Sequence, residues 1–383
     1  MRALFVAAPL PGHVIPLVPL ATAMRHAGHK VLFATGGDAL SVRDSGFTVT
    51  DVAPGFTFRP VVRRVMMRHP LVARAELAGN GGNRGAPLIF GAINDRIVDE
   101  VVAVARSFGP DLVLYDSAAP AGAIAAATLG VPAVLHGIGL FDDAEQTRVI
   151  SAGMTKAPGS FGPATRPPYA ASVTIAPPSV VGPRPGRPMR YVTHSQGSLP
   201  DWLATRAGRP RVLVTRSTVG DPGGGGLMRA VVAAAPEVDA EFVLICPGRR
   251  ITRRLPANVR TVGWIPFSAA LATSSAIVHH GGTGTALGAL AAGLPQLVVP
   301  GLADRRYNAD VVSARGAGLA MRPGQITAEH LTRLVTDPAI AAAAGEVRDE
   351  IAAMPAPEAL VESLAALAGT TNSTKDRSWH TAC

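Results

Sequence analysis

The sequence predicts an α/β protein built from two doubly wound, mostly parallel sheets, one in each half of the chain. Its 383 residues exceed the usual size of one domain, and 48% of them are hydrophobic, which suits two separate cores. In both halves, short apolar runs alternate with segments of helical periodicity, a pattern typical of parallel strands covered by helices on both faces. Between the halves, residues 166–190 are rich in Pro, Gly and Arg and predict an irregular, stiff connection.

In the N-terminal half, the expected elements follow one another in strand–helix order, and the first helix ends at Gly28. Expected strands cover residues 4–6, 31–34, 112–115 and 133–135, and expected helices cover 14–27, 93–108 and 119–129. Residues 57–85 are rich first in Arg and then in Gly and Asn, with poor periodicity. They predict a mobile loop over the cleft between the domains.

The C-terminal half repeats this order. Expected strands cover residues 211–215, 241–246, 259–262, 276–279 and 296–299, with helices between them. The simplest architecture is therefore two doubly wound domains that face each other across a cleft. We expect an N-terminal domain over residues 1–198 and a C-terminal domain over residues 199–368. The polar, aperiodic residues 369–383 are expected to form a disordered tail.

Composition excludes several classes of protein. The net charge of +9 is carried by arginine, since Lys30, Lys156 and Lys375 are the only lysines. Zinc-ligand spacing, an aromatic-rich RNA-binding pattern and a basic heptad helix are all absent, so nucleic acid is not an expected partner. Two distant cysteines, Cys246 and Cys383, indicate a reducing cytosol. Without a signal peptide or an unbroken apolar span, a cytoplasmic protein is expected.

The most informative motif is HHGGTGT at residues 279–285. It follows the apolar residues 276–278 and precedes an Ala/Leu-rich segment, which is the order of a strand, a glycine-rich turn and a helix N-terminus. Such a helix end offers free N–H groups and the positive end of its dipole to an anion. Two histidines and two threonines add side-chain donors. The motif therefore predicts a phosphate or diphosphate site.

The same glycines allow a second interpretation. Gly282, Gly284 and Gly288, with Asp304 further along the chain, resemble a variant of the dinucleotide-binding fingerprint. An NAD(P)-dependent oxidoreductase is therefore an alternative, although it gives no role to the paired histidines or to Asn308.

Two other polar residues follow strands that belong to the same sheet. Gly12 and His13 come after the first strand, and Asp116 ends another N-terminal strand. Both side chains are expected at the carboxyl edge of the sheet, where α/β proteins bind ligands. A histidine there can act as a general base, and a carboxylate within reach would orient it. A capping or surface role for His13, and an N-cap role for Asp116, remain open.

Two loops in the C-terminal half carry further candidates. The loop after residues 212–214 contains Thr215, Ser217 and Thr218, whose hydroxyl groups would contact a phosphate or cap a helix. Trp264 follows the expected strand at residues 259–262, and on a loop it could stack on a base. Packing in a core is the alternative for this tryptophan.

Ordered motifs extend over nearly the whole chain. They comprise residues 9–19 (PLPGHVIPLVP), 110–116 (PDLVLYD), 177–179 with 190–192, 262–264, 279–300, Asp304, Asn308 with Ala309, 316–318 and 354–355. Together they resemble the signature of the nucleotide-sugar glycosyltransferases of the GT-B fold. Within that group the chain is most similar to the GT1-family enzymes that glycosylate bacterial polyketides and other natural products.

The resemblance implies a role for each motif. His13 would deprotonate the acceptor, with Asp116 as its partner, and Trp264 would stack on the pyrimidine base of the donor. The remaining implied contacts to the nucleotide sugar come from Thr218, His280, Gly282, Gly284, Thr285, Asp304 and Asn308. Because the protein supplies these donors, the family needs no metal and no cofactor. Attack opposite the leaving nucleotide would invert the anomeric centre.

The implied activity is metal-independent transfer of a sugar from a nucleoside-diphosphate donor to an aglycone such as a polyketide. In the most similar-looking relatives the donor is a TDP-deoxysugar. Two departures bear on it. Many relatives have a sugar-contacting glutamine where this chain has Arg305, and the 216–218 loop lacks their usual glycine. These departures motivate one alternative, an auxiliary GT-B protein that activates a partner transferase. A nucleotide-sugar epimerase is another. The chain is expected to be a monomer or a homodimer.

Overall fold

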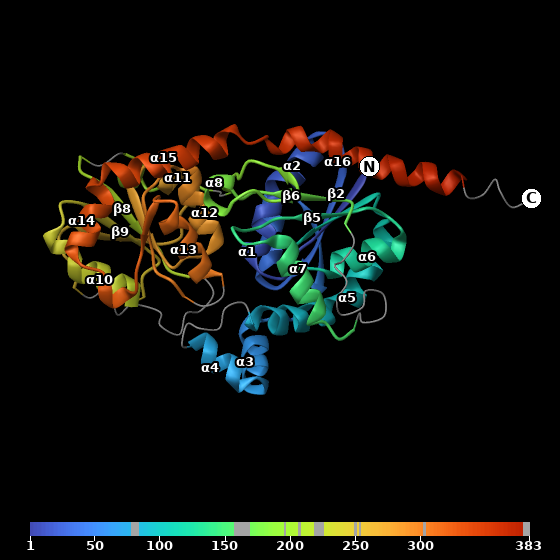
Figure 1. Cartoon of the computed structure of the whole chain (residues 1–383), viewed down its shortest axis with the longest axis horizontal. Helices are drawn as coiled ribbons and strands as arrows, with labels where there is room; N and C mark the ends of the chain where they lie inside the picture. Colours follow the sequence, from blue (N-terminus) through green and yellow to red (C-terminus); the bar gives the residue numbers. More distant parts are fainter. Residues whose placement is uncertain are drawn as a thin grey trace, which may run out of the picture. The chain divides into compact units, whose positions relative to one another are not determined.

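The computed structural model in Figure 1 contains two compact α/β units. The N-terminal unit comprises Met1–Ile175, Arg184–Arg190 and Met354–Cys383, and the C-terminal unit comprises Ala176–Pro183 and Tyr191–Ala353. The structure describes the chain except for residues 78–83, 157–168, 195–196, 206–207, 218–225, 249–250, 253, 302–303 and 378–383.

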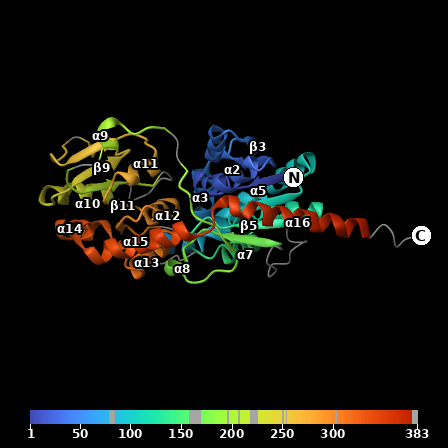
Figure 2. The same ribbon diagram turned by 90° about the horizontal axis from the view of Figure 1, so that it is seen from above.

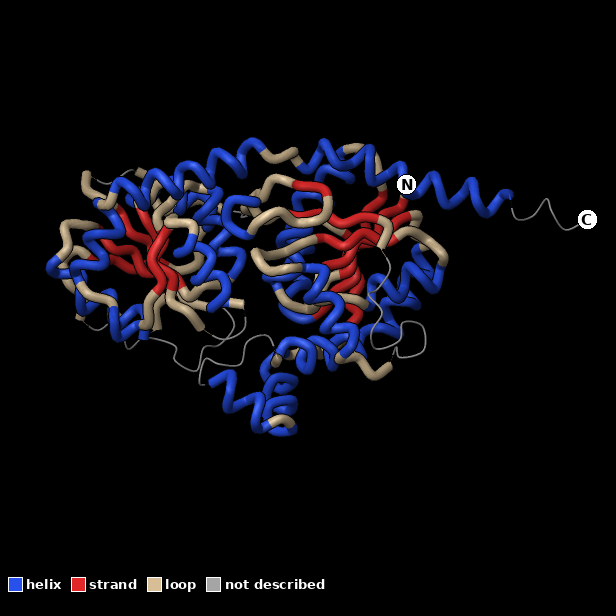
Figure 3. The backbone as a smooth tube through the Cα atoms, viewed as in Figure 1, coloured by secondary structure: helices blue, strands red, loops and turns tan. Residues whose placement is uncertain are grey.

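The N-terminal unit is built on a seven-stranded parallel sheet with the order β3-β2-β1-β4-β5-β6-β7. Figure 3 draws the strands in red and the helices that cover them in blue. The strands are β1 (Arg2–Val6), β2 (Lys30–Gly36), β3 (Thr48–Ala53), β4 (Leu112–Asp116), β5 (Ala133–His136), β6 (Ala171–Thr174) and β7 (Arg187–Pro188). From β1 the chain adds β2 and β3 on one side, and β4 then returns to pair with β1 on the other. This reversal is a topological switch point, where doubly wound proteins bind ligands beyond the strand ends.

Helices cover both faces of this sheet. They are α1 (Pro11–Val14), α2 (Val18–His26), α3 (Phe58–Arg68), α4 (Pro70–Leu77), α5 (Gly85–Phe108), α6 (Ala121–Leu129), α7 (Asp143–Ala152) and α16 (Pro357–Arg377), with 3-10 turns η1 (Ile15–Leu17) and η2 (Gly37–Ser45). Leu4 and Val6 of β1 join the core under α5 and α6. Because side chains alternate along a strand, Phe5 faces the other side, where it stacks on Phe33 with ring centroids 5.1 Å apart.

The C-terminal unit contains a six-stranded parallel sheet with the order β10-β9-β8-β11-β12-β13. Its strands are β8 (Arg211–Val214), β9 (Glu241–Ile245), β10 (Val259–Val262), β11 (Ala276–His279), β12 (Gln296–Val298) and β13 (Gly318–Ala320). A second switch point lies between β8 and β11, since β9 and β10 extend the sheet one way and β12 and β13 the other. Both doubly wound sheets predicted from the sequence are thus present.

The helices of this unit also cover both faces of their sheet. They are α8 (Pro178–Val181), α9 (Asp201–Ala204), α10 (Gly226–Ala234), α11 (Phe267–Ala272), α12 (Thr283–Ala291), α13 (Arg305–Ala314), α14 (Ala328–Thr336) and α15 (Pro338–Ala353), with η3 (Ala235–Glu237) and η4 (Pro323–Gln325). On β8, Val212 and Val214 belong to one buried cluster and Leu213 to a second cluster on the opposite face.

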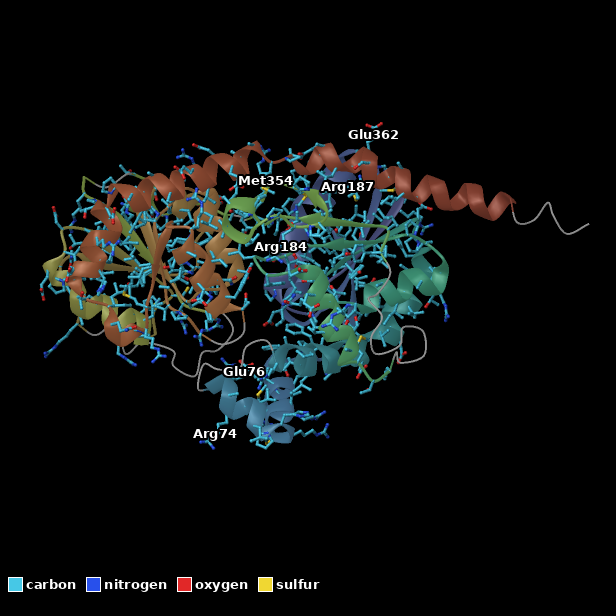
Figure 4. The ribbon with its side chains drawn as sticks, in the orientation of Figure 1. Arg74, Glu76, Arg184, Arg187, Met354 and Glu362 are labelled. Carbon is cyan, nitrogen blue, oxygen red and sulfur yellow. The ribbon has the colours of Figure 1, made fainter. Side chains whose placement is uncertain are left out.

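The structure differs from the sequence expectation at residues 57–85, where α3 and α4 replace much of the predicted loop. Phe58, Val61 and Val65 recur at helical spacing. Phe58 and Val61 pack on the N-terminal core and Val65 is buried, while the arginines between them are exposed. Arg74 and Glu76 project from α4 (Figure 4). Regular helices therefore replace the predicted irregular loop in the described residues, and residues 78–83 lie outside the described part of the chain.

The proline-rich connection is also more regular than expected. Within residues 166–190, β6 and β7 extend the N-terminal sheet and α8 begins at Pro178. Both prolines that enter these elements occupy tolerated positions. Pro178 is in the first turn of α8, where a backbone N–H has no helical acceptor, so the N–H that proline lacks is not needed. Pro188 lies on the outermost strand, β7.

The end of the chain returns to the N-terminal unit. Helix α16 contacts α2 and β4 and can be followed in Figure 2. Its residues Leu360 and Leu364 are buried, whereas Glu362 points away from the unit (Figure 4). The sequence assigns residues up to 368 to the second domain and a disordered tail to the rest, but α16 continues to Arg377. Among the described helices, none alone has the length and composition of a membrane span; only α15 and Pro357–Gly369 together do, as a pair bent by 44°.

Candidate active site

The first site element is a His–Asp pair at the switch point of the N-terminal sheet. His13 lies on the short helix α1 directly after β1, and Asp116 is the last residue of the neighbouring strand β4. His13 Nδ1 is 3.2 Å from Asp116 Oδ1. The Asp116 side chain is fully buried, whereas 14% of the His13 side chain remains exposed. The imidazole is therefore accessible and its carboxylate partner is not.

Backbone groups fix this pair. The N–H groups of Ala8 and Ala118 donate to the two Asp116 carboxylate oxygens over 2.7 and 2.6 Å. Since the carboxylate accepts hydrogen bonds, the His13 Nδ1–H donates to it, and Nε2 keeps a lone pair for a substrate proton. Phe90 packs beside the imidazole, with ring centroids 5.1 Å apart. The structure thus brings together the two side chains that the sequence places at this edge of the sheet; their roles as base and orienting carboxylate stay a prediction.

The structure adds two titratable residues beneath this pair that the sequence analysis missed. His136 ends β5 in register with Asp116, and burial lowers its pKa to about 4. Asp143 begins α7, and burial raises its pKa to about 7, although the Ile138 N–H donates to it over 3.1 Å. The sequence did contain a signal for His136, because it directly follows the expected strand at residues 133–135. Asp116 was identified by the same kind of position, at the end of a strand.

These groups predict how stability depends on pH. Burial lowers the pKa of His136 and of His279 to about 4, so the unfolded chain binds protons near pH 6.5 that the native state does not. Asp143 acts in the opposite direction, because burial raises its pKa from 3.8 to about 7. Its contribution therefore lowers the free energy of unfolding as pH rises from about 4 to about 7. With more histidines than aspartates shifted, we expect the free energy of unfolding to fall as pH drops from about 6.5 to about 4.

Urea unfolding at a series of pH values measures this dependence. The variant His136→Asn keeps a donor for the Gly137 carbonyl, which His136 Nδ1 contacts over 2.7 Å, but cannot titrate. It should flatten the pH dependence. An unchanged slope in this variant would contradict the assignment of the shifted group.

The second site element is the glycine turn between β11 and α12 in the C-terminal unit. Gly281 has a positive φ of 80°, which favours glycine, and Gly282 is the N-cap of α12. A Cβ on Gly282 would collide with His280 Nε2, so glycine lets the imidazole lie over the turn. The first N–H groups of α12 have no helical carbonyl to bind. The turn thus has the glycine conformation and the unpaired helix N–H groups on which the predicted phosphate site depends.

The paired histidines have different roles. His279 is buried, lies 2.8 Å through Nε2 from Gln296 Oε1, and accepts the Gly281 N–H at Nδ1 over 3.1 Å. It therefore fixes the turn from beneath. His280 lies above it, and burial, His279 and Arg305 lower its pKa to about 3. At neutral pH both imidazoles are uncharged.

A hydrogen-bonded clamp joins the turn to α13. The Thr283 hydroxyl donates to Asp304 Oδ2 over 2.6 Å, and Asn308 Nδ2 donates to the same oxygen over 3.0 Å. Asn308 Nδ2 also reaches the Gly281 carbonyl over 2.8 Å. Asn308 is fully buried. The geometry thus makes Asn308 a positioning residue of the turn, with Asp304 as the shared acceptor.

Two family models match this chain. The N-terminal domain of the erythromycin biosynthesis protein CIII-like family matches residues 22–217, and its C-terminal domain matches residues 229–367. The chain belongs to the EryCIII-like glycosyltransferases. It is 37% identical to the elloramycin glycosyltransferase ElmGT of Streptomyces olivaceus over 374 residues, which cover 93% of this chain and 95% of ElmGT.

Solved structures agree with this assignment. The glycosyltransferase SnogD from Streptomyces nogalater matches with a TM-score of 0.81 and 36% identity, over 96% of this chain and 99% of SnogD. The Streptomyces sp. SF2575 glycosyltransferase SsfS6, complexed with thymidine diphosphate, matches with a TM-score of 0.79 and 27% identity, over 96% of this chain and 99% of SsfS6. The fold of this EryCIII-like glycosyltransferase is GT-B, as the sequence predicts, and the oxidoreductase alternative is wrong.

The remaining predicted site residues of this EryCIII-like glycosyltransferase lie around the C-terminal sheet. Trp264 follows β10 and the residue is 79% exposed, so it is a surface residue and not part of a core. Thr285 is in the first turn of α12, and the carbonyl of the exposed Gly284 accepts the Tyr191 hydroxyl over 3.2 Å. Thr218 lies outside the described residues.

Proposed function

We propose that this glycosyltransferase transfers a deoxysugar from a thymidine diphosphate donor to a polyketide-type aglycone, with inversion at the anomeric carbon. Its relatives support both substrate classes. SsfS6 and the spinosyn rhamnosyltransferase SpnG were each solved with thymidine diphosphate, and SpnG also with spinosyn aglycone. Another relative is the aclacinomycin-T 2-deoxy-L-fucose transferase of Streptomyces galilaeus.

The His13–Asp116 pair is the observation that carries the proposal. His13 Nε2 takes the proton from the acceptor hydroxyl, and the oxygen attacks the anomeric carbon from the face opposite the diphosphate. The bond between that carbon and the diphosphate oxygen breaks, which inverts the configuration. Asp116, buried 3.2 Å from His13 Nδ1, stabilises the imidazolium that forms.

The C-terminal unit holds the leaving group in this proposal. As the bond to the sugar breaks, negative charge grows on the diphosphate, where the free N–H groups and dipole of α12 stabilise it. Gly282, Gly284 and Thr285 lie at this helix end. His280 contributes a hydrogen bond rather than a charge, since its pKa is lowered to about 3. The exposed Trp264 stacks on the base of the donor.

A thermal-shift experiment tests the donor class. Thymidine diphosphate at about 100 times its Kd should stabilise the native state by about 2.7 kcal/mol and raise Tm. The same shift is expected with EDTA present, because the diphosphate contacts come from the protein. Uridine diphosphate and NAD(P) are the comparison ligands. A shift with NAD(P) but with neither nucleoside diphosphate would overturn the proposal.

Turnover separates this proposal from an auxiliary role. The protein alone, given a TDP-deoxysugar and an aromatic polyketide aglycone, should release thymidine diphosphate and form a glycoside of inverted configuration. An auxiliary protein would form glycoside only after a partner transferase is added. An epimerase would consume the donor without any acceptor.

A further inference from the structure

Arg305 lies against the glycine turn. It is the first residue of α13, and a Cβ on Gly281 would lie 2.8 Å from the Arg305 carbonyl oxygen and 3.1 Å from Arg305 Cβ. Its side chain passes Gly301, where a Cβ would lie 3.0 Å from Arg305 Cδ. The guanidinium then donates from Nη2 to Ser217 Oγ over 2.8 Å. Since Ser217 follows β8 and the turn follows β11, Arg305 links the two loops of this switch point.

This hydrogen bond couples the two positions at which the chain departs from its family pattern. The serine hydroxyl is neutral and mostly buried, so it orients the guanidinium without balancing its charge. Among the described residues, no carboxylate forms an ion pair with Arg305. The neighbouring Asp304 directs Oδ2 to Thr283 and Asn308 instead. A half-buried cation without a counter-ion favours an anionic ligand.

The other candidate for a positive charge at the turn is His280, and it is neutral. Burial, His279 and Arg305 together lower its pKa to about 3. The helix dipole supplies only about half an elementary charge. The Arg305 guanidinium, in contrast, offers a full positive charge to a diphosphate that leaves with growing negative charge.

We propose that Arg305, oriented by Ser217, binds the donor diphosphate and thereby selects donors whose sugar is neutral rather than cationic. This inference rests on the proposed function, because it takes the turn as the nucleoside-diphosphate site. A guanidinium presents paired N–H donors that match phosphate oxygens. The sugar is bonded directly to the second phosphate, so an ammonium group on it lies within several ångströms of Arg305 and is repelled.

Binding of thymidine diphosphate and thymidine monophosphate, measured by calorimetry, tests the first part. The variant Arg305→Gln should lose about 10- to 100-fold in affinity for the diphosphate and little for the monophosphate, the range for one charge-assisted hydrogen bond. Arg305→Lys keeps the charge without the paired donors and should be intermediate, as should Ser217→Ala. The diphosphate affinity of Arg305→Gln should also depend less on salt. Arg306→Gln, on the same helix, is the matched control.

A pair of donors tests the second part. One is a TDP-6-deoxyhexose, and the other carries an amino group in place of one hydroxyl. The wild type should prefer the neutral donor in kcat/KM, and Arg305→Gln should reduce this preference about tenfold, which a merely structural role would not do. If folded Arg305→Gln and Arg305→Lys keep the wild-type preference for diphosphate over monophosphate, the role of Arg305 is wrong, while the proposed function still stands. Failure of the wild type to bind thymidine diphosphate would overturn the proposed function with it.

Discussion

Replacing His13 with alanine is expected to lower kcat for glycosylation by about 10²- to 10⁴-fold, the usual contribution of a general base. The acceptor hydroxyl then has no base 3.2 Å from a buried carboxylate to take its proton. Thymidine diphosphate should bind with an unchanged Kd, because the glycine turn belongs to the other unit. Initial rates and calorimetry measure the two quantities separately.

Two further variants show whether a loss of kcat in His13→Ala comes from the missing base. Asp116→Asn keeps the size of the side chain but removes the charge that accepts the His13 Nδ1–H, so a large loss of kcat is expected as well. His26→Ala removes an exposed histidine of the same unit and should leave the rate unchanged. Turnover retained in His13→Ala would exclude His13 as the base.

The substitution Gly281→Ala is expected to abolish most of the affinity for thymidine diphosphate. The residue has a φ of 80°, which costs a non-glycine residue about 1–2 kcal/mol. In addition, the new Cβ would lie 2.8 Å from the Arg305 carbonyl and force α13 away from the turn. That movement pulls on the hydrogen bond from Asn308 to the Gly281 carbonyl and exposes the clamp to water.

Gly316→Ala is the matched control, because Gly316 has a φ of 79° but its Cβ would meet only Ala343 Cβ at 3.7 Å. Both variants should lose stability in urea unfolding, by about 1–2 kcal/mol from the backbone strain alone. Only Gly281→Ala should lose thymidine diphosphate binding. Equal affinities in the two variants would show that the position of α13 does not matter to the turn.

Sequence reasoning located the His13–Asp116 pair because strand ends in a parallel sheet share one edge. Apolar runs identify the strands, and the polar residue after each run then falls at the carboxyl end of the sheet. The strand order then explains why the two side chains meet, because β1 and β4 are neighbours at the switch point. His136 follows from the same rule, and its position in register with Asp116 required the pairing of β4 with β5.

Features that depend on tertiary packing could not be predicted in this way. The clamp joins Thr283 to Asp304, which are separated by most of α12 and β12, and no periodicity marks such a contact. Helix α3 contains four arginines and is followed by His69, and Val65 is its one buried side chain. Its apolar face is therefore too narrow to be recognised against the arginine-rich local composition. The local sequence pattern likewise does not indicate that α16 packs on α2.

The return of the chain to its first unit has a consequence for how such enzymes can be recombined. The chain passes between the units after Ile175, Pro183, Arg190 and Ala353, so the N-terminal fold is complete only when α16 has been made. During synthesis, the strands of the N-terminal sheet precede the helix that covers α2 by the whole C-terminal sheet. Exchanging Tyr191–Ala353 between two relatives therefore needs a junction near Ala353 as well as one near Arg190, and α8 then stays with the host chain. A single crossover would bring in a foreign α16.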